Sequence, residues 1–237
     1  ESTQYRALAA RLNYLAMDRP DIQFATKEVA RHMANPTAGN WLLMKRLGRY
    51  LKGSPRLVQL FRWQDAPNSL DGYTDSDWAG DKISRKSTSG GIVLRGAHAV
   101  KSWSSNQTVI ALSSAEAELY ALLKGASQVL GLKSMGWDFG DALAAGLWSD
   151  ASAAIAISQR SGLGKLRHLA CQSLWIQQKV RTKEIELRKV RGDCNPADLF
   201  TKHLSEDKVL RFLDKLGFQL REGRARVGEG PSTSHER

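Results

Sequence analysis

The spacing of apolar positions predicts a helical segment at the start of the chain. Tyr5, Leu8, Leu12 and Leu15 recur three or four residues apart, which is the period of one helix face. Two more amphipathic helices are expected over 22–33 and 41–51, because proline-containing breaks at 19–21 and 35–37 and the Gly53-Ser54-Pro55 stop separate them. Residues 1–53 therefore read as three helices.

After Pro55 the pattern alternates and predicts strands among helices. Expected strands cover 57–63, 70–75, 92–94, 100–104, 146–150 and 185–190. Expected helices cover 113–131, 151–158 and 166–179, and a last helix begins at Asn195-Pro196 and breaks near Ser205. Antiparallel strands followed by βαβ units favour an α/β fold with a mixed sheet flanked by helices.

Charge and cysteine content narrow the function classes. The 35 Lys and Arg residues exceed the 24 Asp and Glu residues and give a net charge of +11, which favours a polyanionic partner such as nucleic acid, although basic charge can also serve solubility. Cys171 and Cys194 stand apart, so zinc and disulfide frameworks are not expected, and a reducing intracellular setting fits. No apolar run is long enough to span a bilayer, so no membrane partner is expected.

A strand that runs into a carboxylate-rich loop is the central motif. On the strand within 70–81, Asp75 and Asp77 share a face, where two carboxylates repel each other unless a cation lies between them. A hard ion such as Mg²⁺ prefers oxygen ligands and would relieve this repulsion. The alternative is a solvated strand end, because Asp also favours turns.

Acids elsewhere in the chain fall where they could converge on this motif, at strand ends and early helix turns. They are Asp75, Glu118, Asp150 and Asp198. The strands that carry Asp75 and Asp150 could be parallel neighbours, since helices separate them in sequence. Four acids that meet without basic partners need metal, as in a two-metal phosphoryl-transfer site with ions about 4 Å apart. Asp77 remains an alternative to Asp75, and helix periodicity does not choose between Glu116 and Glu118.

Five motifs occur in an order that resembles the ribonuclease H domain of copia-type retrotransposon reverse transcriptases. They are residues 70–81, 85–91, 112–118, 148–150 and 195–202. Segments 14–22 and 49–53 are similar to the connection between polymerase and ribonuclease H in the same polyproteins. The resemblance covers about residues 5–216, and the shared order makes it specific where each motif alone is weak.

The resemblance implies a ribonuclease H-like fold with a five-stranded mixed sheet and a site that binds two Mg²⁺, with Mn²⁺ as a substitute. The implied catalytic and metal-binding residues are Asp75, Glu118, Asp150 and Asp198. The family pattern prefers Asp75 to Asp77, and the Ala-Glu-Leu context prefers Glu118 to Glu116. The implied reaction cuts the RNA strand of an RNA–DNA hybrid and leaves 5′-phosphates, with one ion activating water and the other stabilising the leaving 3′ oxygen.

The resemblance and the charge pattern also suggest residues that contact the nucleic-acid backbone. They are Arg85, Lys86, Ser87, Thr88, Ser113, Ser114 and His168, with Lys101, Trp103 and Gln107 as further candidates. For Trp103 core packing is the favoured interpretation. Many ribonucleases H carry a His in the loop before the last Asp, whereas the loop 191–195 here has none.

The expected organisation has three parts: a helical connection segment at 1–55, a ribonuclease H-like domain at 56–220 and a disordered tail at 221–237. The expected partners are an RNA–DNA hybrid and the upstream reverse transcriptase domain of the same polyprotein. We expect a cytoplasmic location in virus-like particles, with the nucleus as a second location. Two other functions fit less well, namely a non-catalytic module that grips hybrid or supports the polymerase, and a two-metal nuclease or recombinase acting on DNA.

Overall fold

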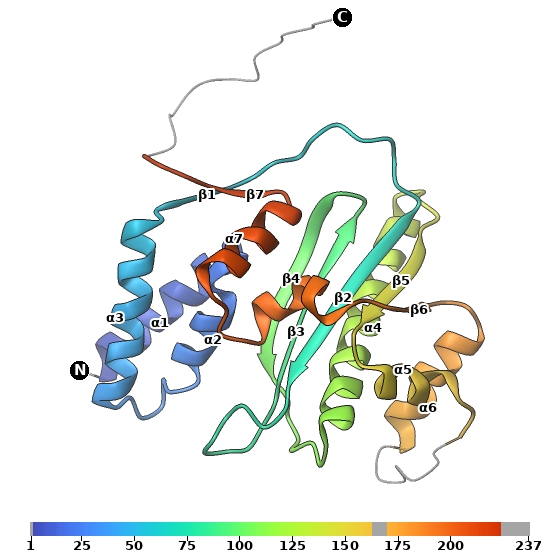
Figure 1. The fold of residues 1–237 in the computed structure, drawn as a ribbon, viewed down its shortest axis with the longest axis horizontal. Coiled ribbons are helices and arrows are strands. Elements are labelled where there is room, and N and C mark those ends of the chain that lie inside the picture. Colours follow the sequence, from blue (N-terminus) through green and yellow to red (C-terminus); the bar gives the residue numbers. More distant parts are fainter. Residues whose placement is uncertain (1, 163–169, 224–237) are drawn as a thin grey trace, which may run out of the picture.

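The computed structural model describes residues 2–162 and 170–223, and its first part is helical (Figure 1). The elements are α1 (Ser2–Leu15), the 3₁₀ turn η1 (Pro20–Ile22), α2 (Gln23–Ala30) and α3 (Ala38–Gly53). Thr37 caps the start of α3 with a capping box. Its hydroxyl accepts a hydrogen bond from the Asn40 backbone N–H, and the Thr37 backbone N–H donates to Asn40 Oδ1. These helices have a core of their own around Tyr5, Ile22 and Met44.

A five-stranded mixed sheet forms the centre of the molecule (Figure 1). Its strands are β2 (Ser69–Asp77), β3 (Thr88–Arg95), β4 (His98–Asn106), β5 (Ala144–Ser149) and β6 (Glu186–Lys189). The spatial order is β4-β3-β2-β5-β6. The first three strands are antiparallel neighbours, whereas β2, β5 and β6 run parallel. This sheet, its flanking helices and the preceding helical segment confirm the predicted ribonuclease H-like fold.

Helices cover the sheet on both faces because neighbouring residues of a strand point to opposite sides. On β3, Val93 packs into the core beneath α4, while Ile92 packs into a second core with Phe200 and Leu213. The covering elements are α4 (Ser114–Asp138), α5 (Ser152–Gln159), α6 (Ala170–Arg181), the 3₁₀ turns η3 (Gly192–Cys194) and η4 (Pro196–Phe200), and α7 (Glu206–Lys215). The expected break at Ser205 is confirmed, since Ser205 precedes α7.

The chain also forms a small second sheet. The strand expected over 57–63 is shorter in the structure, where β1 (Arg56–Gln59) pairs antiparallel with β7 (Phe218–Arg221). Strand β7 was not predicted from the sequence, and it reaches one residue into the expected tail. Residues 224–237 of that tail lie outside the described residues, and the three-part domain division stays a prediction.

Helix α2 attaches the N-terminal helices to the sheet. The Gln23 side-chain amide donates hydrogen bonds to the Ser102 hydroxyl on β4 and to the Ala16 carbonyl, both at 2.9 Å. Phe24 also meets the His203 ring edge-on, with ring centroids 4.8 Å apart.

Within the residues described here, none of the helices combines the length and apolar character needed to cross a bilayer.

Gly125 lets α4 lie close against β2. A Cβ atom at this position would overlap the Thr74 methyl group on β2 and would come within 3.0 Å of Leu147 Cδ1. Gly131, in the same helix, has open space around its Cα. The two glycines therefore share a helical backbone but differ in the room available for a methyl group.

We expect Gly125→Ala to destabilise the fold and Gly131→Ala to stabilise it. Overpacking at Gly125 should cost about 1–3 kcal/mol, whereas Gly131→Ala should gain up to about 1 kcal/mol from helix propensity alone. Denaturant unfolding of both variants measures the difference, and equal shifts for the two would show that α4 does not need this close approach.

Candidate active site

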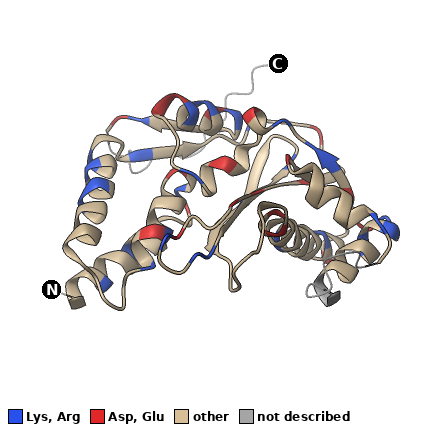
Figure 2. Cartoon of the chain, turned by 60° about the horizontal axis from the view of Figure 1, so that its bottom comes forward, with Lys and Arg blue, Asp and Glu red and all other residues tan. Residues whose placement is uncertain are grey.

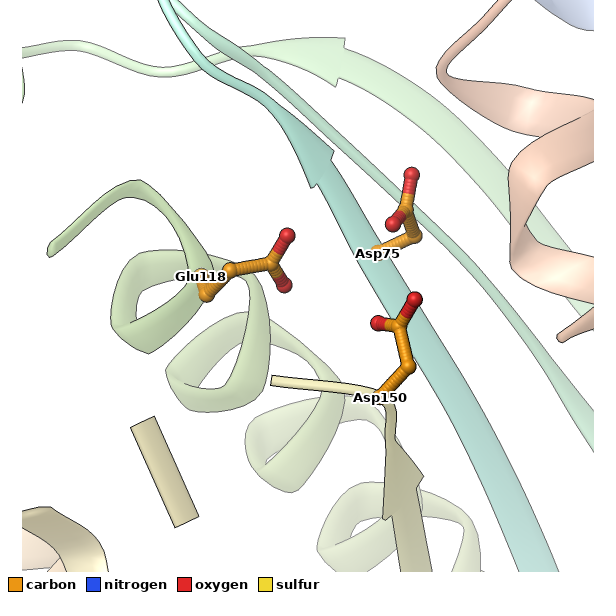
Figure 3. A group of neighbouring side chains, drawn as sticks. All are labelled: Asp75, Glu118 and Asp150. Atoms are coloured by element: carbon orange, nitrogen blue, oxygen red, sulfur yellow. The ribbon is translucent and has the colours of Figure 1, made fainter. Parts of the chain in front are cut away.

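Three carboxylates from three elements point toward one another at one end of the sheet's strands (Figure 3). Asp75 lies on β2, Glu118 on α4 and Asp150 directly after β5. One oxygen from each lies within 4.8 Å of one from each of the others. This is a spacing at which a single cation can contact all three acids.

The topology of the sheet brings these acids together. Strands β2 and β5 are parallel neighbours, with Tyr73 opposite Trp148, so Asp75 and Asp150 follow at the same end of the sheet. Glu118 lies in the second turn of α4, where its Oε1 accepts a hydrogen bond from the Ser76 amide at 3.3 Å. The predicted parallel arrangement of the two acid-bearing strands is therefore confirmed.

The structure separates the alternative acids from this group. Asp77 accepts a hydrogen bond from the Thr88 amide on β3 and lies outside the group. Glu116 is 2% exposed, and its Oε2 accepts a hydrogen bond from the Leu112 amide at 2.9 Å, just before the helix begins. Glu116 thus helps to close the start of α4, and Asp75 and Glu118 are the acids that meet.

The fourth predicted acid, Asp198, joins Asp75 through a lysine. Asp198 lies on η4, and its Oδ1 is 2.7 Å from Lys202 Nζ, which is 3.2 Å from Asp75 Oδ1. The Thr201 hydroxyl donates a hydrogen bond to the other oxygen of Asp75. Neither Thr201 nor Lys202 was predicted as a site residue, although both belong to the 195–202 motif and Lys202 follows Asp198 by one helical turn.

Asn195 fixes η4 beside β2. Its side-chain amide donates to the Thr74 carbonyl at 3.0 Å, and its Oδ1 accepts from the Ala197 amide at 3.1 Å. Asn195 is fully buried, so these bonds form away from water. This contact sets the position of Asp198 relative to Asp75.

Burial and the charges of neighbouring carboxylates make Asp75 and Glu118 hard to ionise. Burial is the main cause that raises the pKa of Asp75 to about 6, against the opposing effects of Lys202 and Thr201. Burial, followed by the charges of Asp75 and Asp150, raises the pKa of Glu118 to about 8. Each shift measures how unfavourable a negative charge is at that place.

The donor atoms fit a hard divalent cation. All are carboxylate oxygens, which Mg²⁺ and Mn²⁺ prefer. Glu118 Oε2 is buried and has no hydrogen-bond partner among the described residues. A buried, unpartnered carboxylate oxygen beside two other acids is costly unless a cation contacts it. The residues present therefore fit such an ion.

The predicted nucleic-acid contacts divide into exposed and internal groups. Arg85 and Ser114 are exposed and Lys86 is half-buried. Ser87 and Thr88 are fully buried, and their hydroxyls accept hydrogen bonds from the Ala79 amide and from Lys27. The Ser113 hydroxyl caps α4 by accepting from the Glu116 amide. His168 lies outside the described residues.

The further candidates for nucleic-acid contact also divide into internal and exposed side chains. Gln107 is buried and donates to the Ser89 hydroxyl and to the Ala117 carbonyl, so its amide supports the fold. Trp103 packs in the core beneath α4, as expected. Lys101 is exposed.

The loop that lacks a histidine passes beside Asp150. A Cβ atom built on Gly192 would lie 3.0 Å from Asp150 Oδ2, so the backbone of this loop approaches the acid closely. The next residues are Asp193 and Cys194, and Cys194 is exposed. Gly192 therefore has little room for a side chain beside Asp150.

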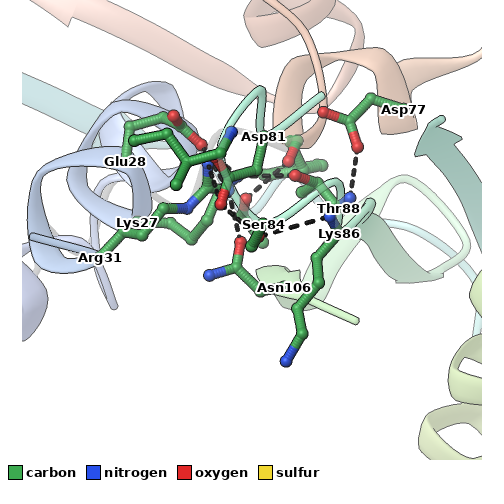
Figure 4. A network of polar contacts seen from close by, with 12 residues as sticks. Lys27, Glu28, Arg31, Asp77, Asp81, Ser84, Lys86, Thr88 and Asn106 are labelled. Carbon is green, nitrogen blue, oxygen red and sulfur yellow. Dashed lines mark hydrogen bonds and ion pairs between the residues drawn. The ribbon is translucent and has the colours of Figure 1, made fainter. Parts of the chain in front are cut away.

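A polar network ties α2 to the start of β3 (Figure 4). Lys27 Nζ donates to the Thr88 hydroxyl at 2.6 Å and pairs with Glu28 Oε1 at 2.5 Å. Arg31 bonds Asn106 Oδ1 at 2.6 Å and pairs with Asp81 at 3.6 Å. Because Thr88 pairs with Asp77, two residues beyond Asp75, the N-terminal helices support the strand end that carries the site.

Lys and Arg residues are distributed over several elements rather than over one face alone (Figure 2). A run of them follows the outer side of α3. Its members, Lys45, Arg46, Arg49 and Lys52, are all exposed. Such exposure is compatible with a solvated helix face and equally with contact to nucleic acid.

Comparison with known proteins finds similar sequences in plant transposons. The chain is 32% identical over 221 residues to the retrovirus-related Pol polyprotein from transposon RE1 of Arabidopsis thaliana, covering 92% of this chain and 15% of that polyprotein. It is 30% identical to the corresponding polyprotein from transposon TNT 1-94 of Nicotiana tabacum, over 86% of this chain and 15% of the relative. The chain thus spans about a seventh of these relatives.

The solved structures to which this chain is similar include LC11-RNase H1, isolated from compost. It is 16% identical, has a TM-score of 0.44, and the match covers 56% of this chain and 93% of that one. No protein-family model matches the chain. The fold assignment therefore depends on strand order and register.

The raised pKa values predict how stability depends on pH without metal. Unfolded carboxyl groups have pKa values of about 4, so the folded chain retains protons that the unfolded chain releases. The free energy of unfolding in EDTA should therefore decrease as pH rises from about 4 to about 8. Glu118→Gln should flatten this slope in denaturant unfolding at pH 5 and pH 8, whereas an unchanged slope would contradict the pKa shift of Glu118.

The contact between Lys27 and Thr88 should be measurable as a coupling energy. A buried hydrogen bond from a charged donor is worth about 1.5–3 kcal/mol, so Lys27→Met and Thr88→Val should each destabilise the fold. In a double-mutant cycle by denaturant unfolding, we expect a coupling of at least about 0.5 kcal/mol. Purely additive effects would mean that α2 does not hold the start of β3.

Proposed function

Because this chain belongs to the retrovirus-related Pol polyproteins of copia-type transposons, we propose that it is their ribonuclease H and cuts the RNA strand of RNA–DNA hybrids during reverse transcription. The observation that carries the proposal is the convergence of Asp75, Glu118 and Asp150. Three acids from separate elements, held together against their own repulsion, serve no packing purpose.

The chain's residues divide the work of metal-dependent hydrolysis. Asp75, Glu118 and Asp150 would hold a divalent ion, and Asp198 would help to hold a second one beside Asp75. Bound ions supply an activated water and charge stabilisation for the leaving 3′ oxygen. The protein contributes fixed carboxylate positions, which are set by β2, β5, α4 and the bonds of Asn195.

The proposed substrate is recognised through its backbone charge. The exposed Arg85, the half-buried Lys86 and the exposed Ser114 are placed to contact phosphates or sugars. A net charge of +11 would favour association with a polyanion. We further propose that the upstream reverse transcriptase domain of the same polyprotein is the second partner, and that the protein acts in cytoplasmic virus-like particles or in the nucleus.

A non-catalytic module that only grips hybrid is the alternative function. A module of this kind would not need three convergent carboxylates, and it would be more stable without the two whose pKa values burial raises, Asp75 and Glu118. The complete set of acids therefore supports the nuclease over the gripping module.

We expect cleavage of an RNA–DNA hybrid in Mg²⁺, with loss of cleavage in EDTA. Asp150→Asn should reduce the rate by at least about 100-fold, because even outer-shell partners of metal ligands are worth about 10–100-fold. The exposed Asp207→Asn serves as the matched control and should leave the rate unchanged. A labelled RNA strand resolved on a denaturing gel measures both the rate and the cut strand.

Two outcomes would contradict the nuclease. Tight hybrid binding by the wild type without cleavage in Mg²⁺ or Mn²⁺ would support the gripping module. Cleavage that survives Asp150→Asn would show that the reaction takes place elsewhere.

A further inference from the structure

Lys202 lies between two of the acids that the proposed nuclease needs. Its Nζ is 2.7 Å from Asp198 Oδ1 and 3.2 Å from Asp75 Oδ1. The ion pairs that Asp75 and Asp198 form within the described part of the chain are both with this one ammonium group. Lys202 therefore bridges β2 and η4 by charge.

The two sides of Asp75 differ in their partners. On one side, its carboxylate faces Glu118 and Asp150, and Glu118 Oε2 has no hydrogen-bond partner among the residues described. On the other side, Lys202 and the Thr201 hydroxyl contact both of its oxygens. Among the described residues, the acids on the first side make no ion pair, whereas the other side already holds the Lys202 ammonium group.

The ammonium is strongly held but can be withdrawn. Burial alone would lower the pKa of Lys202, yet the attraction of Asp75 and Asp198 outweighs it and raises that pKa above its usual value. The Lys202 side chain is 41% exposed, whereas that of Asp75 is 2% exposed. A four-carbon stem with this exposure can turn its ammonium into solvent while both carboxylates stay in place.

We propose that Lys202 is a built-in counter-ion that occupies the cation position between Asp75 and Asp198, and that it must leave before these carboxylates can jointly hold a metal ion. This inference rests on the proposed function, since it concerns the same acids. It makes Lys202 a positioning residue that keeps η4 against β2 in the metal-free protein. It also separates the two metal affinities, because only one of the two positions is free of a resident cation.

Titration of the whole chain with Mn²⁺ alone, followed by the electron paramagnetic resonance signal of free Mn²⁺, tests the proposal. The wild type should bind one ion more tightly than a second. Lys202→Met should tighten the weaker site by about tenfold or more, which corresponds to about 1.4 kcal/mol or more. Lys202→Gln, which keeps a polar group near Asp198, should act in the same direction, and the exposed Lys208→Met is the matched control.

A second readout is the thermal midpoint of unfolding, measured in EDTA and again with Mn²⁺. In EDTA, Lys202→Met should lower the thermal midpoint, because Asp75 and Asp198 lose the charge between them, and Mn²⁺ should restore more of the midpoint than it adds to the wild type. Lys208→Met should behave like the wild type in both conditions.

The proposal would be overturned if Lys202→Met and Lys202→Gln left Mn²⁺ binding unchanged, as Lys208→Met should. It would also be overturned if they weakened the binding of the second ion. The first result would make the ammonium a bystander, and the second would make it a support that the metal site requires. Failure of the nuclease itself looks different. In that case hybrid is not cut, while the effect of Lys202 on Mn²⁺ binding remains.

Discussion

Repulsion among three neighbouring carboxylates, one buried and two half-buried, must be offset by the rest of the fold. Asp75, Glu118 and Asp150 have oxygens within 4.8 Å of one another, in surroundings that raise the pKa of Glu118 to about 8. A fold holds such a group only if packing elsewhere outweighs the electrostatic cost. Here the cores on the two faces of the sheet supply that packing. The acids lie outside these cores, at the end of the sheet where β2 and β5 finish.

The elements around the site act as a frame with few adjustable parts. Gly125 allows α4 to lie against β2, Asn195 ties η4 to the same strand, and Lys27 bonds the start of β3. Each contact fixes one acid or its strand relative to the others. Preorganisation of this kind is what a metal-dependent site needs, because ligands that are already in place do not have to be ordered when an ion binds.

Periodicity and motif order predicted the helical start, the mixed sheet and the acids that meet. Periodicity alone could not choose between Glu116 and Glu118, because both flank the apolar stripe of α4 and the choice depends on where β2 lies; the preference for Glu118 came from the motif context. Pairing of β1 with β7 was beyond reach for a similar reason, since it joins residues some 160 positions apart. Lys202 was missed because a lysine one turn after an aspartate usually forms an ordinary helix-surface pair, and only the fold brings Asp75 to it.

Whether the three acids form a divalent metal site can be seen by anomalous diffraction from crystals grown with Mn²⁺. We predict an anomalous peak in contact with carboxylate oxygens of Asp75, Glu118 and Asp150 together. Crystals of Asp150→Asn grown in the same way should show that peak weakened or lost. Well-ordered acids without any peak between them, at Mn²⁺ concentrations that give peaks elsewhere on the molecule, would show that the three acids are not a metal site.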